Sequence, residues 1–285
     1  MLDTRFGIEI EFTGISRWEA ALVAKATLGG NIHGHKNFTV TDRRGRRWQF
    51  VYDGSIKRQY KINGEIREGG EELSVELVTP ILTYRKDVFL LQDLVRHLRK
   101  RGAFTNDTCG IHVHIDGKGH YAGSLRYFML LLADRKELLL SALHIPESRL
   151  KYCRPLEDSL IRRIKESNPT TLKDMEKLWY ADYAENRDKK YHKSRYHLLN
   201  LHCFFHGNKT IELRGFNSTL HAGKVRAYIV FALALNHEAL TARWRHCPYD
   251  RVYLSERSAM MAFTELLGMD KYEFENCRMH LCEYL

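Results

Sequence analysis

Residues 6–14 read FGIEIEFTG, and this stretch decides the fold class that we expect. It alternates in period two, as a half-buried β-strand does. Residues i and i+2 of a strand project from the same face, so Glu9 and Glu11 point together while Ile8 and Ile10 point away. Two such carboxylates repel each other unless a cation or a proton lies between them. The stretch predicts either an acidic face that opens to a cleft or a plain exposed edge strand.

In the rest of the chain, strand and helix patterns mix without the regular βαβ alternation of a parallel sheet. This mixture favours an α+β fold with a mainly antiparallel sheet. The Asn63-Gly64 pair is a strong hairpin signal, and Ser16 is a good N-cap. The expected strands are 6–14, 37–41, 47–52, 73–82 with an interruption near Pro80, 111–116, 196–205 and 210–215. The expected helices start after Ser16 and cover 17–28, 88–102, 124–143, much of 147–187 with a break at Asn168-Pro169, 222–245 and the tail.

Composition narrows the class of protein. No apolar stretch approaches the roughly 20 residues of a membrane span, and the first residues lack a signal peptide, so we expect a soluble cytoplasmic protein. The six cysteines form no CxxC pair, which favours a reduced protein without a structural zinc site. The formal charge of +10 is spread along the chain, and its densest cluster, Arg43 to Arg47 around Gly45, is typical of a solvated hairpin turn. Nucleic acid is therefore not the ligand that we expect.

Further polar residues lie on or at the end of expected strands. His112 and His114 flank Val113, and Glu212 and Arg214 flank Leu213, so each pair shares one face of its strand. Each pair alone could be an ordinary exposed pair or a weak salt bridge. Two more acids share this placement, namely Glu76 inside Val75–Pro80 and Asp53 in Asp53-Gly-Ser55. The shared placement of five acids, two histidines and an arginine indicates a functional site.

The residue types favour one class of metal. An HxH pair invites zinc, but a cupin would carry a glutamate about four residues later, where this chain has Lys118. The abundance of carboxylates instead favours magnesium or manganese. The chain has no GxxxxGK[ST] or GxGxxG phosphate loop and no nucleophile elbow.

The ordered motifs GIEIEF, DGS, ELVTP, CGIHVHID, RYHLLNL and TIELRGFNSTL resemble those of the amidoligase family, a branch of the glutamine-synthetase and glutamate–cysteine ligase superfamily. The match runs from about Phe6 to Asn236. The resemblance implies a glutamine-synthetase-like funnel of curved antiparallel sheet with helices outside. It also implies one catalytic domain over residues 1–285. No motif covers the segment at about 147–187, which we expect to be a helical insertion, with a lid as the alternative.

The resemblance also implies roles for individual residues. The metal ligands would be Glu9, Glu11, Glu76, His112 and Glu212. Arg214 would contact a phosphate, His112 would touch metal or phosphate, and His114 would lie toward the acceptor. Arg195 and Asn200 would lie near substrate or nucleotide, and Asp53 is a weaker candidate. The implied cofactors are ATP and Mg²⁺, with Mn²⁺ as an alternative.

The implied reaction is formation of an amide bond. ATP would convert a carboxylate into an acyl phosphate, which an amine then attacks, and His114 or a site carboxylate could act as the base. Two alternatives stay open, a metal-dependent hydrolase that uses the same Glu/His cluster and a non-catalytic nucleic-acid-binding protein. The motifs leave the acid, the amine and the oligomeric state open, and an amino acid, a peptide end or a cell-wall fragment would fit.

Overall fold

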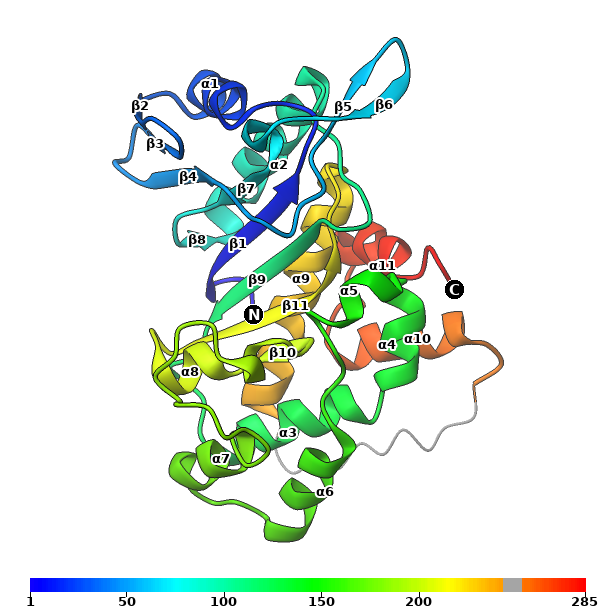
Figure 1. Cartoon of the computed structure of the whole chain (residues 1–285). Helices are drawn as coiled ribbons and strands as arrows, with labels where there is room; N and C mark the ends of the chain where they lie inside the picture. The colour runs from blue at the N-terminus through cyan, green and yellow to red at the C-terminus, as the bar shows by residue number, and fades with distance from the viewer. Residues whose placement is uncertain (243–252) are drawn as a thin grey trace. The chain divides into compact units, whose positions relative to one another are not determined.

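The computed structural model describes residues 1–242 and 253–285 and has a mixed α+β fold (Figure 1). The strands are β1 (Arg5–Phe12), β2 (Asn31–Gly34), β3 (Phe38–Thr41), β4 (Arg47–Val51), β5 (Gln59–Ile62), β6 (Glu65–Glu68), β7 (Val75–Val78), β8 (Leu82–Thr83), β9 (Gly110–Asp116), β10 (Leu199–Asn200) and β11 (Thr210–Asn217). The α-helices are α1 (Arg17–Leu28), α2 (Tyr84–Arg101), α3 (Ala122–Ala133), α4 (Lys136–Leu143), α5 (Glu147–Leu150), α6 (Asp158–Ser167), α7 (Leu172–Trp179), α8 (His202–His206), α9 (Ala222–Thr241), α10 (Glu256–Leu266) and α11 (Glu275–Leu281).

The larger sheet has the strand order β10-β11-β9-β1-β7-β4-β3-β2, with β8 paired to β1, and β5 and β6 form a separate hairpin. The registers of β1 with β7, β7 with β4, β4 with β3 and β3 with β2 are antiparallel, as the sequence predicts. Contacts within the chain define two compact units. We call residues 2–113 and 216–228 the N-terminal unit, and residues 1, 114–215 and 229–285 the C-terminal unit.

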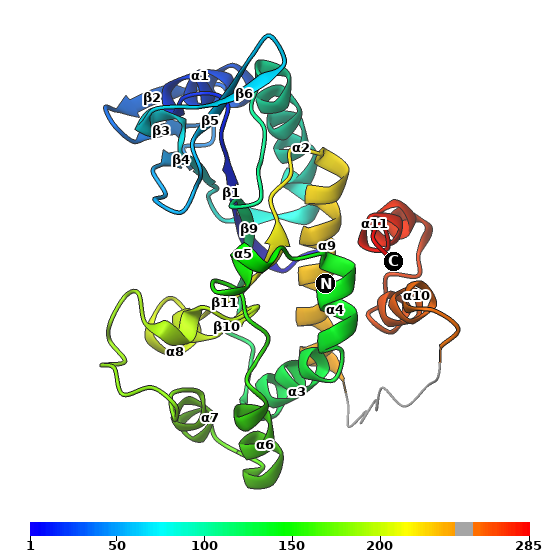
Figure 2. The ribbon, with the colours of Figure 1, turned by 45° about the vertical axis from the view of Figure 1, so that its right-hand side comes forward.

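The N-terminal unit is built on the alternation of β1. Ile8 and Ile10 are fully buried, whereas Glu9 is only half-buried. Helices α1 and α2 pack on each other, and α1 also packs on β2, β3 and β4 (Figure 2). Ser16 caps α1 in a capping box with Glu19, and α2 ends at Gly102 in the left-handed conformation with φ of 112°.

The C-terminal unit is mainly helical. Helices α3, α6 and α7 pack together, and α10 contacts α4 and α11. The described part of α9 is almost completely buried along its middle, as expected for a helix that is apolar on all sides. Three buried polar side chains tie α9 to α3, because His120 hydrogen-bonds Ser124 at 3.0 Å and Asn236 at 3.0 Å.

The structure corrects three of the predicted elements. The single helix at 124–143 is two helices, because Arg135 leaves the helical conformation and stacks its guanidinium over Phe263 at 4.6 Å. The strand at 196–205 is wrong except at Leu199–Asn200, and the Asn200 side chain accepts a hydrogen bond from the His202 N–H at 2.8 Å where α8 starts. The turn at 43–47 is not wholly solvated, since Arg46 pairs with Asp42 at 2.9 Å and with Asp87 at 2.7 Å.

The other elements agree with the sequence within a few residues. The 147–187 segment is helical in α5, α6 and α7, and its break lies at Asn168, which has a φ of 43°. The helix at 222–245 is described up to Thr241, and the end that we predicted at Arg245 lies outside the described residues. The funnel, the single catalytic domain over 1–285 and the status of 147–187 as an insertion stay predictions.

Cysteines and membrane spans can be assessed in the described part of the chain. Cys109, Cys153, Cys203, Cys277 and Cys282 form no disulfide, and Cys247 lies outside the described residues. Among residues 1–242 and 253–285 we find no helix with the length and the apolar character that crossing a bilayer requires.

Candidate functional site

Strand β1 places two carboxylates on one face of the sheet in the N-terminal unit. The Glu9 side chain is 22% exposed and that of Glu11 is 6% exposed. Glu11 is held from two sides, because its Oε2 accepts the Gly110 N–H at 2.7 Å and its backbone carbonyl accepts a hydrogen bond from the Ser218 hydroxyl. These contacts show that Glu11 is a buried carboxylate with a fixed orientation and not a charge on an open edge strand.

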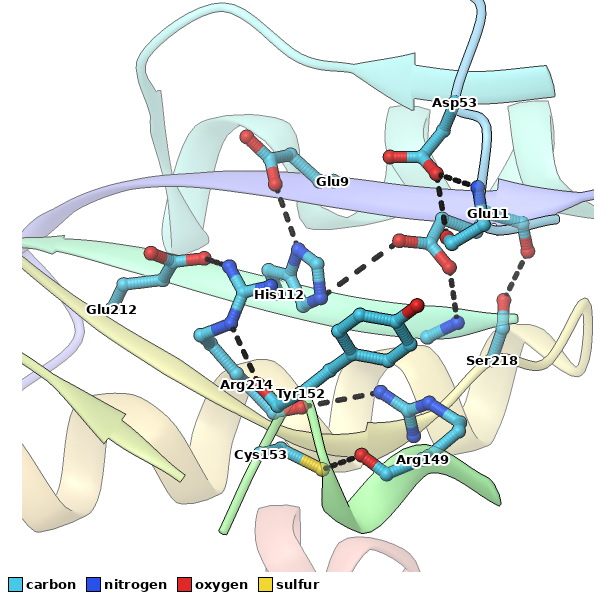
Figure 3. Close-up of polar contacts among 12 residues, drawn as sticks. Glu9, Glu11, Asp53, His112, Arg149, Tyr152, Cys153, Glu212, Arg214 and Ser218 are labelled. Atoms are coloured by element: carbon cyan, nitrogen blue, oxygen red, sulfur yellow. Dashed lines mark hydrogen bonds and ion pairs between the residues drawn. The ribbon is translucent and has the colours of Figure 1, made fainter. Parts of the chain in front are cut away.

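His112 lies between these two carboxylates (Figure 3). Its Nδ1 is 2.8 Å from Glu9 Oε2, and its Nε2 is 3.8 Å from Glu11 Oε1. The imidazole is almost buried, with 8% of the side chain exposed. One ring therefore contacts both acids of the ExE pair. The sequence predicted that the two acids share one face, but it could not predict their contact with a histidine about a hundred residues later.

The antiparallel register of β1 and β7 adds a third acid. Glu76 is directly opposite Glu11 across this pair of strands, and Val51 of β4 lies on the other side of Glu76. A fourth acid, Asp53, follows β4. Its Oδ1 accepts hydrogen bonds from the Ser55 N–H at 2.7 Å and from the Ser55 hydroxyl at 2.5 Å, which leaves Oδ2 outside these bonds.

Together these side chains form what we call the acid–histidine cluster, namely Glu9, Glu11, Asp53, Glu76 and His112. It contains two sets of three ligands whose atoms lie within 4.8 Å of one another, Glu9 with Glu76 and His112, and Glu11 with Asp53 and Glu76. Glu76 belongs to both sets. Carboxylates gathered this closely repel one another unless cations or protons compensate their charge.

Two residues hold Asp53 in position, and the sequence analysis did not identify them. The Ser74 hydroxyl accepts the Asp53 N–H at 3.1 Å and donates to the Asp53 carbonyl at 2.6 Å. Buried Arg17 donates in turn to the carbonyls of Ser74 and Glu71, each at 2.7 Å. Neither Ser74 nor Arg17 lies within a motif, so only their tertiary contacts with backbone atoms reveal this role.

The C-terminal unit contains a second polar cluster, around Glu212 on β11. Glu212 is 1% exposed, its Oε2 accepts a hydrogen bond from Asn200 Nδ2 at 2.5 Å, and its Oε1 pairs with Arg214 Nη1 (Figure 3). The antiparallel register of β10 and β11 sets the first contact, since Asn200 is opposite Glu212. We call Glu212, Arg214, Asn200 and His114 the Glu212 cluster.

Two further contacts complete the Glu212 cluster. His114 Nε2 lies 3.8 Å from Glu212 Oε1. The Arg214 Nε donates to the carbonyl of Tyr152 at 3.4 Å, and Arg149 donates to the carbonyl of Arg214 at 3.3 Å. Arg214 is therefore nearly buried and fixed from three sides, a rigid cation of the kind that binds phosphate or carboxylate.

The predicted site residues thus fall into two groups. Glu9, Glu11, Asp53, Glu76 and His112 gather in the N-terminal unit, and His114, Asn200, Glu212 and Arg214 gather in the C-terminal unit. Arg195 has a different environment, since its guanidinium lies over the rings of Tyr191 at 5.2 Å and Tyr196 at 5.8 Å.

Comparison with known proteins identifies the family of this chain. A family model described as "Putative amidoligase enzyme" matches residues 2–236, and the chain belongs to this amidoligase family. The family description supports a ligase. A search of curated protein sequences found no match.

Proposed function

We propose that the protein is an ATP-dependent carboxylate–amine ligase that forms an amide bond through an acyl phosphate. The observation that carries this proposal is the acid–histidine cluster, in which Glu76 is shared by two sets of possible metal ligands. Membership of the amidoligase family supports the reaction class. The substrates remain a carboxylate and an amine, either small molecules or peptides.

The donor set fits a hard divalent cation such as Mg²⁺, with Mn²⁺ as an alternative. Each of the two sets contributes at least two carboxylates, and oxygen donors are the ligands that these ions prefer. When bound, the ions would neutralise the phosphates of ATP and stabilise the charge that develops during phosphoryl transfer. Glu9, Glu11, Glu76 and His112 would hold them, with Asp53 as a further ligand.

The protein's own residues act by positioning and by charge. His112 orients Glu9 through its 2.8 Å contact, and the Gly110 N–H orients Glu11 at 2.7 Å. In the proposal Arg214 binds a phosphate oxygen, while Glu212 and the Tyr152 carbonyl hold its guanidinium in place. His114 is a candidate for the base that accepts the proton of the attacking amine.

Calorimetric titration with ATP, with and without Mg²⁺, tests this function. We expect ATP to bind only with Mg²⁺, and Glu9→Gln combined with Glu212→Gln to weaken binding at least about tenfold. A positive result would be followed by a screen of amino acids, peptides and amines for ADP release.

Glu68→Gln combined with Glu283→Gln serves as a control, because both glutamates are exposed and lie outside the two clusters. This variant should bind ATP as the wild type does. Absence of ATP binding with any divalent cation would refute the ligase, and turnover of an amide substrate without ATP would favour a hydrolase instead.

A further inference from the structure

Six side chains of the C-terminal unit form a row in which cations cover tyrosine rings. The Lys151 Nζ lies 4.9 Å from the centroid of the Tyr152 ring, and the Tyr152 and Tyr196 rings meet edge to face at 6.0 Å. The row continues through Arg195, which covers both Tyr196 and Tyr191, to Lys190 at 5.3 Å from the Tyr191 ring. We call Lys151, Tyr152, Tyr196, Arg195, Tyr191 and Lys190 the cation–tyrosine row.

Backbone hydrogen bonds join the two segments that supply this row. The Arg154 N–H donates to the Tyr196 carbonyl at 3.1 Å, and the Leu198 N–H donates to the Arg154 carbonyl at 2.7 Å. The row is therefore fixed by the fold, although its two segments lie about forty residues apart in the sequence. It also adjoins the Glu212 cluster, because the Tyr152 carbonyl accepts a hydrogen bond from Arg214 at 3.4 Å.

The cations of the row differ from their neighbours in their ion pairs. In the described residues none of Lys151, Lys190 and Arg195 takes part in an ion pair, whereas neighbouring Lys189 pairs with Glu185 at 3.0 Å. Lys151 and Lys190 are exposed, and the Tyr191 side chain is 59% exposed. A row with three cations, none of them in an ion pair within the described residues, favours an anionic ligand.

The geometry of the rings narrows the ligand class. A surface that binds single-stranded nucleic acid offers open aromatic faces on which bases stack. Here cations lie over these rings, so the rings serve to hold the cations in position. A cation that is already fixed loses less conformational entropy when an anion binds. The row therefore fits clustered carboxylates better than stacked bases.

We propose that the cation–tyrosine row binds an acidic peptide and that this peptide is one substrate of the ligase. The second part of this inference rests on the proposed function. Carboxylates of the peptide would contact Lys151, Arg195 and Lys190, beside the Arg214 end of the row. Residues 151–152 and 190–196 would then make the enzyme selective for a substrate with several negative charges.

The test is binding of a fluorescein-labelled oligoglutamate peptide to the full chain, followed by fluorescence anisotropy without ATP or metal. We expect the wild type to bind it and affinity to fall with salt, and oligoglutamine to bind much more weakly. Combined Lys151→Gln, Lys190→Gln and Arg195→Gln should weaken binding at least about tenfold. A matched control, Lys25→Gln, Lys86→Gln and Arg99→Gln, removes the same charge from exposed positions of the N-terminal unit and should change affinity less than about twofold.

Two tyrosine variants separate positioning of the cations from charge alone. Tyr191→Phe keeps the ring and should bind like the wild type, whereas Tyr191→Leu keeps every charge but should weaken binding about twofold to fivefold. Circular dichroism and thermal unfolding of all variants verify that they fold. A folded Tyr191→Leu with wild-type affinity would refute the positioning role.

Other outcomes would overturn the inference. Equal losses in the row variant and the matched control would show binding by overall charge. Tighter binding of an oligothymidylate that depends on the same residues would assign the row to nucleic acid. A wild type that binds Mg²⁺–ATP but not the peptide refutes this inference alone, whereas peptide binding without ATP binding refutes the proposed ligase and leaves the row as a peptide-binding surface.

Discussion

Glu76 connects the two sets of possible metal ligands in the acid–histidine cluster. It is opposite Glu11 across a pair of strands and belongs to both sets of possible metal ligands. Like charges directly opposite in a sheet destabilise the fold, so we expect this pair to lower stability unless a cation or a proton compensates its charge. The residue that both sets of possible ligands share would then also weaken the metal-free protein.

The substitution Glu76→Gln tests whether this residue favours ion binding and lowers the stability of the metal-free protein. Without divalent ions, and with chelator present, we expect the variant to be more stable than the wild type by about 1 kcal/mol or less, because repulsion is relieved. With Mn²⁺ or Mg²⁺ we expect its affinity for the ion to fall about tenfold to a hundredfold. Thermal unfolding and calorimetry measure the two effects.

Glu72→Gln is the control, because Glu72 is exposed and precedes the same strand. It should leave both ion affinity and metal-free stability unchanged. A Glu76→Gln protein that is less stable than the wild type in chelator, yet binds ions normally, would contradict the assignment of this acid as a ligand.

At the scale of the element, the start of α1 illustrates how local chemistry sets a boundary. The Ser16 hydroxyl accepts the Glu19 N–H at 3.2 Å, and the Glu19 carboxylate accepts the Ser16 N–H at 3.0 Å. The hydrogen bond from the Ser16 backbone is the main reason why the pKa of Glu19 is lowered from 4.5, and it outweighs the opposing effect of burial. Both contacts follow from a four-residue pattern that is visible in the sequence.

Breaking this cap should cost about 1 kcal/mol, within a range of about 0.5 to 2. We expect Ser16→Ala to show this loss in urea unfolding and Ser16→Thr to retain most of the stability. Because a lowered carboxyl pKa stabilises the fold above the unfolded value of 4.5, the stability that Glu19→Gln removes should be present at neutral pH and vanish as the pH falls below 4.5. An equal effect of Glu19→Gln at all pH values would refute the ionic part of the cap.

At the scale of the whole molecule, the C-terminal unit buries several neutral histidines. Burial is the main cause that lowers the pKa values of His120, His192, His197 and His202 from 6.5. The Tyr180 hydroxyl contacts His202 Nδ1 at 2.6 Å, and the rings of His192 and His202 stack at 5.2 Å. Protonation of any of these groups would place a charge in a packed interior.

We therefore expect the protein to lose stability in mild acid. A folded-state histidine pKa below the unfolded value of 6.5 means that the unfolded chain binds more protons as the pH falls, so stability is complete above pH 6.5 and decreases below it. The midpoint of thermal unfolding should be nearly constant from about pH 7 to 8 and fall below about pH 6.5.

Two histidine variants check the origin of this dependence. His120→Gln should reduce the slope of the midpoint against pH in the acid range, while His33→Gln, at an exposed position of β2, should leave it unchanged. If the midpoint does not fall between pH 6.5 and 5, the buried histidines do not control acid stability.

The sequence alone was sufficient to predict the features that depend on interactions between neighbouring residues. The alternation of residues 6–12 specified β1, Ser16 and Glu19 specified the start of α1, and Asn63-Gly64 specified the β5–β6 hairpin with φ values of 50° and 85°. The ordered motifs also identified the family and most members of both clusters, because strand periodicity places alternate side chains on one face.

Only the tertiary structure decided which of these residues meet. Register places Glu76 opposite Glu11, and packing places His112 against Glu9, 103 residues apart in the sequence. Tertiary packing also separates α3 from α4 at Arg135, and backbone hydrogen bonds join the two segments of the cation–tyrosine row. These outcomes depend on pairing and packing between distant segments, whereas periodicity and propensity report only on neighbours along the chain.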